Sequence, residues 1–152
     1  MRLPLALLAL AAPPALAQNV SAADPQSIID AMRANGHKAA LSAERQDSGA
    51  PIVNGGVNGL TYGAFFQACE NGANCQDILF SASFDLETPL TLDYVNDWNF
   101  QRTFGTLTVN DAGDAFVSYY VITEGGLPRQ NFDAVVAVWT SVMEDFAGDI
   151  GF

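Results

Sequence analysis

Two runs of alternating apolar and polar residues, separated by one short loop, constrain the fold of this chain more than any other feature. Alternation with a period of two is typical of a strand that buries one face. The loop between the runs, residues 70–74, consists of turn-forming residues, so the pattern predicts an antiparallel hairpin. The apolar positions are Leu60, Tyr62, Ala64, Phe66 and Ala68 in the first run, and Ile78, Phe80, Ala82, Phe84 and Leu86 in the second.

The first 17 residues have the pattern of an export signal. Arg2 supplies a positive charge, and residues 3–16 are apolar but too few to span a bilayer as a helix. Ala15 and Ala17 are the small residues that a signal peptidase reads. We therefore expect cleavage after Ala17 and a periplasmic or secreted chain that does not insert into the membrane. A retained membrane anchor is the alternative, which the prolines at positions 13 and 14 disfavour.

The charge of the mature chain limits its partners. Loss of the leader would leave five basic residues against 17 acidic ones, a net charge of −12. Such a surface repels phosphate backbones and anionic lipid headgroups, so we expect neither nucleic acid nor a membrane surface as a partner. The 135 remaining residues suit one domain with its own core.

Cys69 and Cys75 bound the turn-forming loop of the predicted hairpin. Export places them in an oxidising compartment, so the spacing favours a structural disulfide at the neck of the hairpin. A redox or zinc site is the alternative. A redox pair usually has two intervening residues, and a zinc site needs more ligands than these two.

Three helices complete the expected order of elements. After a flexible lead-in at residues 18–23, Asp24 and Pro25 predict the start of a first helix that ends at Gly36. Thr88 and Pro89 predict the start of a second by the same logic. The final helix is the best defined, because its apolar residues recur close to every 3.6 positions. Its stripe comprises Phe132, Val135, Val136, Trp139, Val142, Met143, Phe146 and Ile150.

The remaining strands are less uniform in pattern. Residues 38–44 alternate as a half-buried strand. Residues 52–59, rich in Gly and Asn, indicate an irregular connection. Residues 104–123 predict a second hairpin, with Gly113 supplying the positive φ that its turn at residues 110–114 requires. The expected order is helix, three strands, helix, two strands, helix.

Catalytic and metal-binding patterns are sparse. His37 is the only histidine, and a surface position at the end of the first helix is favoured over a role as general base. The loop "NDAGD" faintly resembles a calcium loop but lacks the distal Glu, and a tight turn explains it. Phosphate loops, dinucleotide fingerprints and paired carboxylates do not stand out. We therefore expect no cofactor and no metal.

The stretch "YVNDWN" places Trp98 between Asn96 and Asn99. A ligand cage is one interpretation. The structural interpretation is a buried aromatic side chain at the end of the second helix, with the Asn amides satisfying loose backbone groups. The longer segment "YVNDWNFQRTFGTLTVNDAGDAFVSYYV" resembles the signature segment of the YbjN family of bacterial proteins, and the resemblance covers roughly residues 24 to 150, within the single domain expected over residues 24–152.

The resemblance implies an α+β fold in which helices pack on an antiparallel sheet, similar to type III secretion chaperones. It also implies the vague function of a sensory transduction regulator and brings no catalytic residues. We expect a non-enzymatic module of the cell envelope that binds a protein or peptide. A homodimer is a further possibility. A small-ligand sensor and a hydrolase with scattered carboxylates are the alternatives. The predicted leader distinguishes this chain from the cytoplasmic members of the family.

Overall fold

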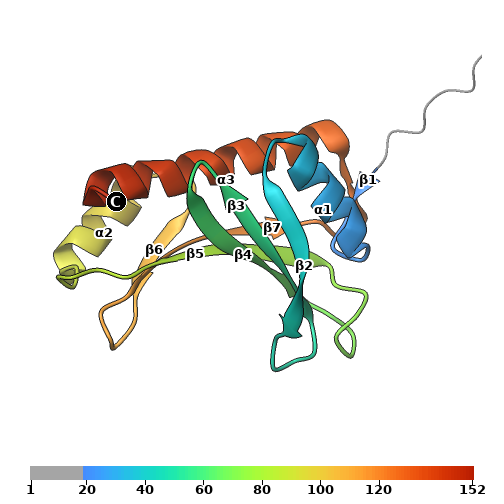
Figure 1. The fold of residues 1–152 in the computed structure, drawn as a ribbon, viewed down its shortest axis with the longest axis horizontal. Helices are drawn as coiled ribbons and strands as arrows, with labels where there is room; N and C mark the ends of the chain where they lie inside the picture. The colour runs from blue at the N-terminus through green and yellow to red at the C-terminus, as the bar shows by residue number, and fades with distance from the viewer. Residues whose placement is uncertain (1–18) are drawn as a thin grey trace, which may run out of the picture.

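The computed structural model describes residues 19–152, which form one α+β domain (Figure 1). Six strands make an antiparallel sheet in the order β2-β3-β4-β5-β7-β6, and β1 pairs with β8 apart from it. The helices are α1 (Pro25–Ala34), α2 (Leu92–Gln101) and α3 (Arg129–Ile150). The strands are β1 (Asn19–Val20), β2 (Lys38–Arg45), β3 (Pro51–Val57), β4 (Leu60–Gln67), β5 (Asp77–Phe84), β6 (Thr106–Val109), β7 (Ala115–Ile122) and β8 (Leu127–Pro128).

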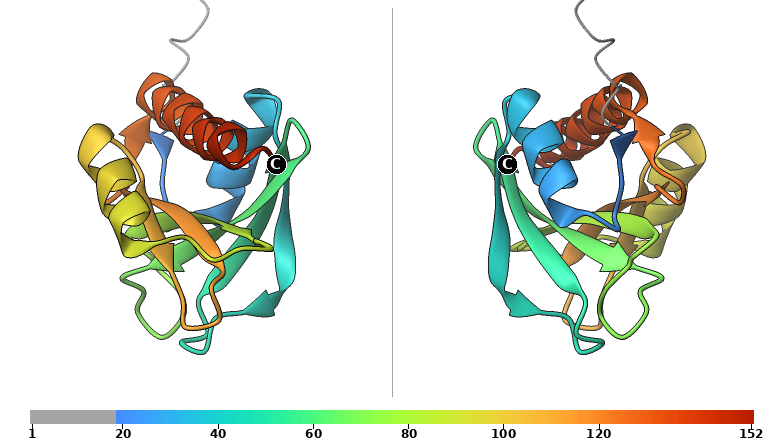
Figure 2. Two further views of the ribbon diagram at one scale, coloured as in Figure 1. Left: turned by 90° about the vertical axis from the view of Figure 1, so that its left-hand side faces the viewer. Right: turned by 90° about the vertical axis from the view of Figure 1, so that its right-hand side faces the viewer.

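All three helices lie on the same side of the curved sheet (Figures 1 and 2). Helix α3 runs along the length of the molecule, with α1 near one end and α2 near the other. The strand residues that face the helices are buried, as the alternation predicts. The opposite face of the sheet carries no helix within residues 19–152, which makes it the surface of interest.

The apolar stripe of α3 forms the centre of the core. Phe132, Trp139 and Phe146 are fully buried, and the Trp139 ring stacks on Phe80 of β5 at 5.7 Å between ring centres. The helix starts at Arg129, slightly before the predicted stripe, and ends at Ile150 as expected. The prediction of this helix is confirmed, because a sustained 3.6-residue repeat leaves few alternatives.

The segment expected as an irregular connection is a regular strand, so four strands rather than three separate α1 from α2. Strand β3 pairs continuously with β4 from Ile52 to Val57 and with β2 on its other side. Gly55 is required there, because a Cβ at this position would overlap the ring of Tyr62. The glycines of this segment therefore serve close packing within a strand, rather than a turn.

Part of the predicted flexible lead-in is ordered, which corrects that prediction for the residues from Asn19 onward. Strand β1 pairs with Leu127–Pro128, and Val20 is buried in the core. The Ala22 N–H donates to Oγ1 of Thr123 at 2.8 Å, because the segment must satisfy its backbone where it is buried. The predicted leader and Gln18 lie outside the described residues.

Helix α2 begins later than predicted. Thr91 caps it by accepting a hydrogen bond from the Tyr94 N–H at 3.2 Å, and the helix extends from Leu92 to Gln101. Pro89 instead lies beside Gly113, where a Cβ would approach the proline Cγ to 2.9 Å. Gly113 has φ of +93° in the predicted turn between β6 and β7, which is confirmed.

The predicted disulfide is present between Cys69 and Cys75. It closes the loop that joins β4 to β5, and Cys75 is buried. Neither cysteine is free, which removes both thiols as nucleophiles or metal ligands. Within residues 19–152, no helix has the length and apolar character that a membrane crossing requires.

Candidate protein-binding face

The uncovered face of the sheet is almost free of charge. The four inner strands β3, β4, β5 and β7 direct 15 residues toward it, as their alternation and register show, and Asp77 is the one charged side chain among them. The chain as a whole has 17 acidic and six basic residues. Depletion of charge beside exposed apolar side chains is the compositional mark of an interface core. The large apolar residues here are Ile52, Phe65, Leu79, Phe116, Tyr120 and Ile122.

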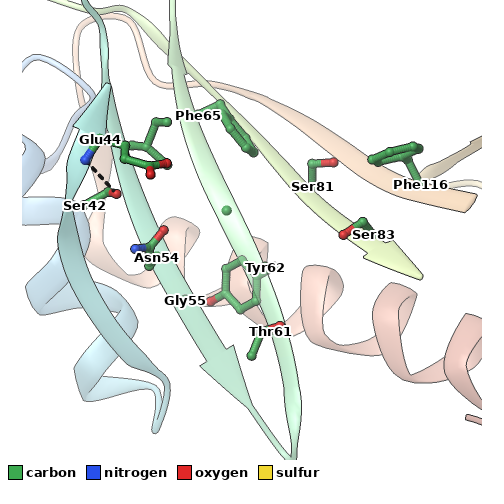
Figure 3. Close-up of a pocket in the computed structure, with 12 residues that line it drawn as sticks. Ser42, Glu44, Asn54, Gly55, Thr61, Tyr62, Phe65, Ser81, Ser83 and Phe116 are labelled. Atoms are coloured by element: carbon green, nitrogen blue, oxygen red, sulfur yellow. Dashed lines mark hydrogen bonds between the residues drawn. The ribbon is translucent and has the colours of Figure 1, made fainter. Parts of the chain in front are cut away.

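An open hollow of about 440 Å³ lies on this face (Figure 3). Phe65 and Phe116 stand on neighbouring parts of its wall, with Ser81 between them in this view. Hydroxyl and amide groups supply hydrogen-bonding capacity, and Glu44 from β2 is the carboxylate among the lining residues. The lining thus combines aromatic rings with neutral polar groups, which suits contact with a neutral surface. The neutral polar residues are Ser42, Asn54, Thr61, Ser81 and Ser83.

The ring of Phe65 is held flat against the sheet. A Cβ on Gly63 would lie only 2.5 Å from the Phe65 ring, so the ring covers the position that a side chain at residue 63 would occupy. This placement orders an aromatic ring on the solvent side of the sheet without burying it in the core. A partner would therefore meet a surface that loses little conformational entropy on binding.

A hydrogen-bonded pair lies at the end of the face where β5 begins. The Tyr120 hydroxyl donates to Oδ2 of Asp77 at 2.8 Å. This hydrogen bond raises the pKa of Tyr120, and desolvation and the charge of Asp77 add to the effect. Oδ1 of Asp77 is buried and has no hydrogen-bond partner within residues 19–152. The pair thus combines a buried acceptor atom with an exposed phenol ring.

Both outer edges of the sheet are obstructed by side chains. On β6, the amide of Asn99 bonds both backbone groups of Leu107. On β2, Nε of Arg33 donates to the Ala39 carbonyl at 2.9 Å. Strand β2 then shifts register, and Ser42 Oγ accepts a hydrogen bond from the Glu44 N–H. Bulges and capped backbone groups hinder the addition of another strand.

Strand β3 is paired on both sides, so the segment from Ile52 to Val57 offers no free edge to a partner.

The residues of the "YVNDWN" stretch do not converge on a common point. Trp98 is 3% exposed and lies under the guanidinium of Arg102, whose Cζ is 4.3 Å from the ring centre. Asn96 is exposed in the middle of α2, and Asn99 lies two residues before the end of that helix. Their expected place at the end of the helix is wrong, because the helix continues to Gln101. The Asn99 amide does satisfy backbone groups, but those of a strand.

The model of one protein family matches residues 24–152, and its description reads "Putative bacterial sensory transduction regulator". This chain belongs to the YbjN family. No curated protein and no solved structure gives a significant match. The expected likeness to type III secretion chaperones therefore stays a prediction, whereas the α+β class of this YbjN domain is confirmed.

The position of His37 differs from the prediction. It is 6% exposed in the YbjN domain, whereas a surface position was expected. Its ring contacts Tyr62 of β4 and Thr140 of α3, at hydrogen-bond distance from both. Burial lowers the pKa of His37. The position after Gly36 suggested a surface residue, but the chain turns inward as it enters β2.

The hydrolase alternative requires carboxylates gathered in a hollow, and a second hollow of the YbjN domain is lined by three of them. It has a volume of about 630 Å³, lies beside the C-terminal end of α3 and is lined in part by Asp85, Glu87 and Asp149. All three residues are exposed, and Asp149 forms an ion pair with Arg102 at 2.7 Å. Within residues 19–152, no group of three His, Cys, Asp or Glu residues is arranged to hold a metal ion.

The aromatic residues of the uncovered face were not predicted as a site. Phe65 and Leu79 occupy the polar phase of their alternating strands, and Phe116 does so in β7. Large apolar residues out of phase are the sequence signal that could have indicated this surface.

Proposed function

We propose that this YbjN-family chain is an exported, non-enzymatic regulatory module that binds a partner protein through the uncovered face of its sheet. The observation that supports it most is the concentration of apolar and neutral polar side chains on this face of a strongly acidic chain. Solvated carboxylates normally populate an exposed sheet surface of such a chain. Their near absence here indicates selection for contact with another surface.

The mode of contact follows from the edges of the sheet. A peptide that added a strand would have to displace Asn99 from Leu107 or Arg33 from Ala39. Contact through side chains on the face needs neither change. We therefore infer that the partner packs on the hollow between Phe65 and Phe116, rather than extending the sheet.

A charge placed on the face tests this function. Ser83 is exposed on the face, and Ala137 is exposed on α3 on the helical side. Envelope proteins captured by the mature chain would be identified, and their binding would then be compared between Ser83→Arg and Ala137→Arg. We expect Ser83→Arg to lose most of the binding and Ala137→Arg to retain it, with unchanged circular dichroism for both. Equal binding by the two variants would refute the proposed face.

A second copy of the chain is one partner that this test must separate. Light scattering over a range of concentrations measures self-association directly, and Ser83→Arg should abolish it if the face joins two copies. A mass that stays monomeric in the wild-type chain excludes a second copy as the partner.

The small-ligand alternative has a specific observation in its favour, the hollow on the face. A ligand that binds only the folded state raises the melting temperature. A thermal-shift screen of the wild-type chain against Ser83→Arg would detect such a ligand, and its shift should disappear in the variant.

Export can be tested separately. We expect mass spectrometry of the protein from its native host to find a chain that starts at Gln18. Intact protein with Met1 in the membrane fraction would contradict export with cleavage.

A further inference from the structure

His37 links the helical layer to the sheet through a chain of three side chains. Nδ1 of His37 lies 2.6 Å from the Tyr62 hydroxyl, and Nε2 lies 3.1 Å from Oγ1 of Thr140. His37 follows the turn that ends α1, Tyr62 belongs to β4 and Thr140 belongs to α3. His37 and Tyr62 are both buried, so these hydrogen bonds connect the end of α1, β4 and α3 within the protein.

The hydrogen-bond donors fix the protonation of the ring. Thr140 donates its one hydroxyl proton to the Val136 carbonyl at 2.9 Å, because a carbonyl can only accept. Oγ1 of Thr140 must therefore accept from Nε2–H of His37. A neutral imidazole has a single N–H, so Nδ1 accepts, and the Tyr62 hydroxyl must donate to it. Each of the protons shared among His37, Tyr62 and Thr140 therefore has one defined position.

Addition of a proton to His37 breaks this arrangement. The new Nδ1–H would point at the Tyr62 oxygen, and Tyr62 would have to turn its own O–H away. The Tyr62 ring is surrounded by Phe80 and Trp139, at 6.1 and 5.5 Å between ring centres. Within residues 19–152 the Tyr62 hydroxyl bonds no group other than His37, so its turned proton would lose its hydrogen bond, and a buried unpaired donor is costly. Tyr62 does not lose the proton instead, because burial raises its pKa.

The charged side chains on the surrounding elements form other contacts or are exposed, and none of them bonds His37 within residues 19–152. From α1, Arg33 donates to the Ala39 carbonyl, and Lys38 of β2 is exposed. From α3, Glu144 accepts from Asn58 at 2.6 Å, and Asp133 pairs with Arg129. Burial is the cause that lowers the pKa of His37, without a contribution from any of these charges.

We propose that the His37–Tyr62–Thr140 chain is an acid-sensitive latch, which holds α3 and the end of α1 against the sheet and opens when His37 takes up a proton. The latch goes beyond the proposed binding function and does not depend on it. It would let the pH of the compartment control how firmly the helical layer stays attached to the sheet.

The direction of the effect follows from linkage. The folded chain holds His37 neutral, so its pKa lies below the ordinary value of 6.5 that applies once the latch is open. The stabilisation is complete above pH 6.5 and decreases as the pH falls from there toward the folded pKa. One proton can change the ratio of open to closed molecules by at most about tenfold per pH unit.

The test compares urea unfolding of the mature chain with that of His37→Gln between about pH 7.5 and 5. We expect the ratio of their unfolding constants, wild type over variant, to rise by up to tenfold per pH unit below pH 6.5. The two proteins contain the same carboxyl groups, so the pH dependence that these groups contribute cancels in the ratio. A ratio that does not change with pH would overturn the latch.

A second measurement covers the case in which His37→Gln does not fold. The chain has one histidine, so an untagged sample gives a single imidazole resonance. We expect that resonance in the folded wild type to titrate below pH 6.5, and Tyr62→Phe to move its midpoint upward because the competing hydroxyl is gone. A folded midpoint at 6.5 that Tyr62→Phe leaves unchanged would refute the proposal.

Discussion

The side-chain amide of Asn99 bonds both backbone groups of Leu107. The Leu107 N–H donates to Oδ1 at 2.8 Å, and Nδ2 donates to the Leu107 carbonyl at 3.0 Å. An amide side chain has the same donor and acceptor as a peptide group, so Asn99 stands in for one residue of a further strand. Helix α2 is thereby attached to the edge of the sheet through β6.

Replacement of Asn99 should therefore destabilise the fold. Asn99→Leu leaves the outward N–H and carbonyl of Leu107 without a protein partner, and we expect a loss of about 1 to 3 kcal/mol in the free energy of unfolding. Urea denaturation measures it. Asn96→Ala is the matched control, because Asn96 is exposed in the same helix, and it should change stability by less than about 0.5 kcal/mol. Equal effects of the two substitutions would mean that the Leu107 hydrogen bonds contribute nothing.

Trp98 should be essential for stability, because it is buried against other side chains of the core. It lies beneath Arg102 and meets the edge of Phe146 at 5.9 Å between ring centres. We expect Trp98→Ala to cost about 3 to 5 kcal/mol, the usual range for a buried large aromatic residue. Phe100→Ala, in the same helix but 91% exposed, should cost almost nothing.

Fluorescence provides the independent check on Trp98. In Trp139→Phe, which keeps Trp98 as the one tryptophan, emission should be blue-shifted and weakly quenched by iodide. Free access of iodide would place Trp98 at the surface and restore the ligand-cage interpretation.

Loss of the disulfide should weaken the fold without changing it. The bond joins residues six positions apart, and such a short loop contributes roughly 2 kcal/mol by the chain-entropy estimate. We expect the double variant Cys69→Ala and Cys75→Ala to melt at a lower temperature with the same circular dichroism spectrum. Unreduced wild-type protein should not react with a thiol reagent after denaturation, and two labelled cysteines would contradict the bond.

Gly55 and Gly148 should respond in opposite directions to the same substitution. In Gly55→Ala, the new methyl group overlaps the Tyr62 ring, and we expect a loss of about 1 to 3 kcal/mol from overpacking. In Gly148→Ala, the methyl group meets no atom within 4 Å on α3, and we expect a gain of about 0.5 to 1 kcal/mol. Urea denaturation distinguishes the two, and a tolerated Gly55→Ala would show that β3 can shift away from Tyr62.

The elements that the sequence predicts well each carry a local pattern that places their apolar residues on one face. Phe80 and Phe84 alternate with Ser81 and Ser83, and only a strand with one buried face satisfies that order. The repeat of α3 is equally restrictive. Strand β3 was missed because its glycines are identical, in sequence, to those of a loop. The ring of Tyr62 leaves no room for a side chain at Gly55. Because Tyr62 belongs to another strand, this requirement cannot be read from the local residues.

The candidate face could be predicted only in part. Phe65 and Phe116 stand out of phase in their strands, but nothing local shows that they lie on one surface, since β4 and β7 are brought together by β5. His37 was misplaced for the same reason. Its partners Tyr62 and Thr140 are 25 and 103 residues away along the chain.

The obstructed edges also determine which assemblies this chain can form. An open sheet edge allows copies to join side by side without limit, which produces fibres. Here Arg33 occupies the Ala39 carbonyl of β2 and Asn99 occupies both backbone groups of Leu107 in β6, which hinders pairing of the next molecule at those positions. Copies that associate through the uncovered face, with the same surface used by each, would instead form a contact that closes after two molecules. We therefore expect self-association through this face to stop at a pair with two-fold symmetry.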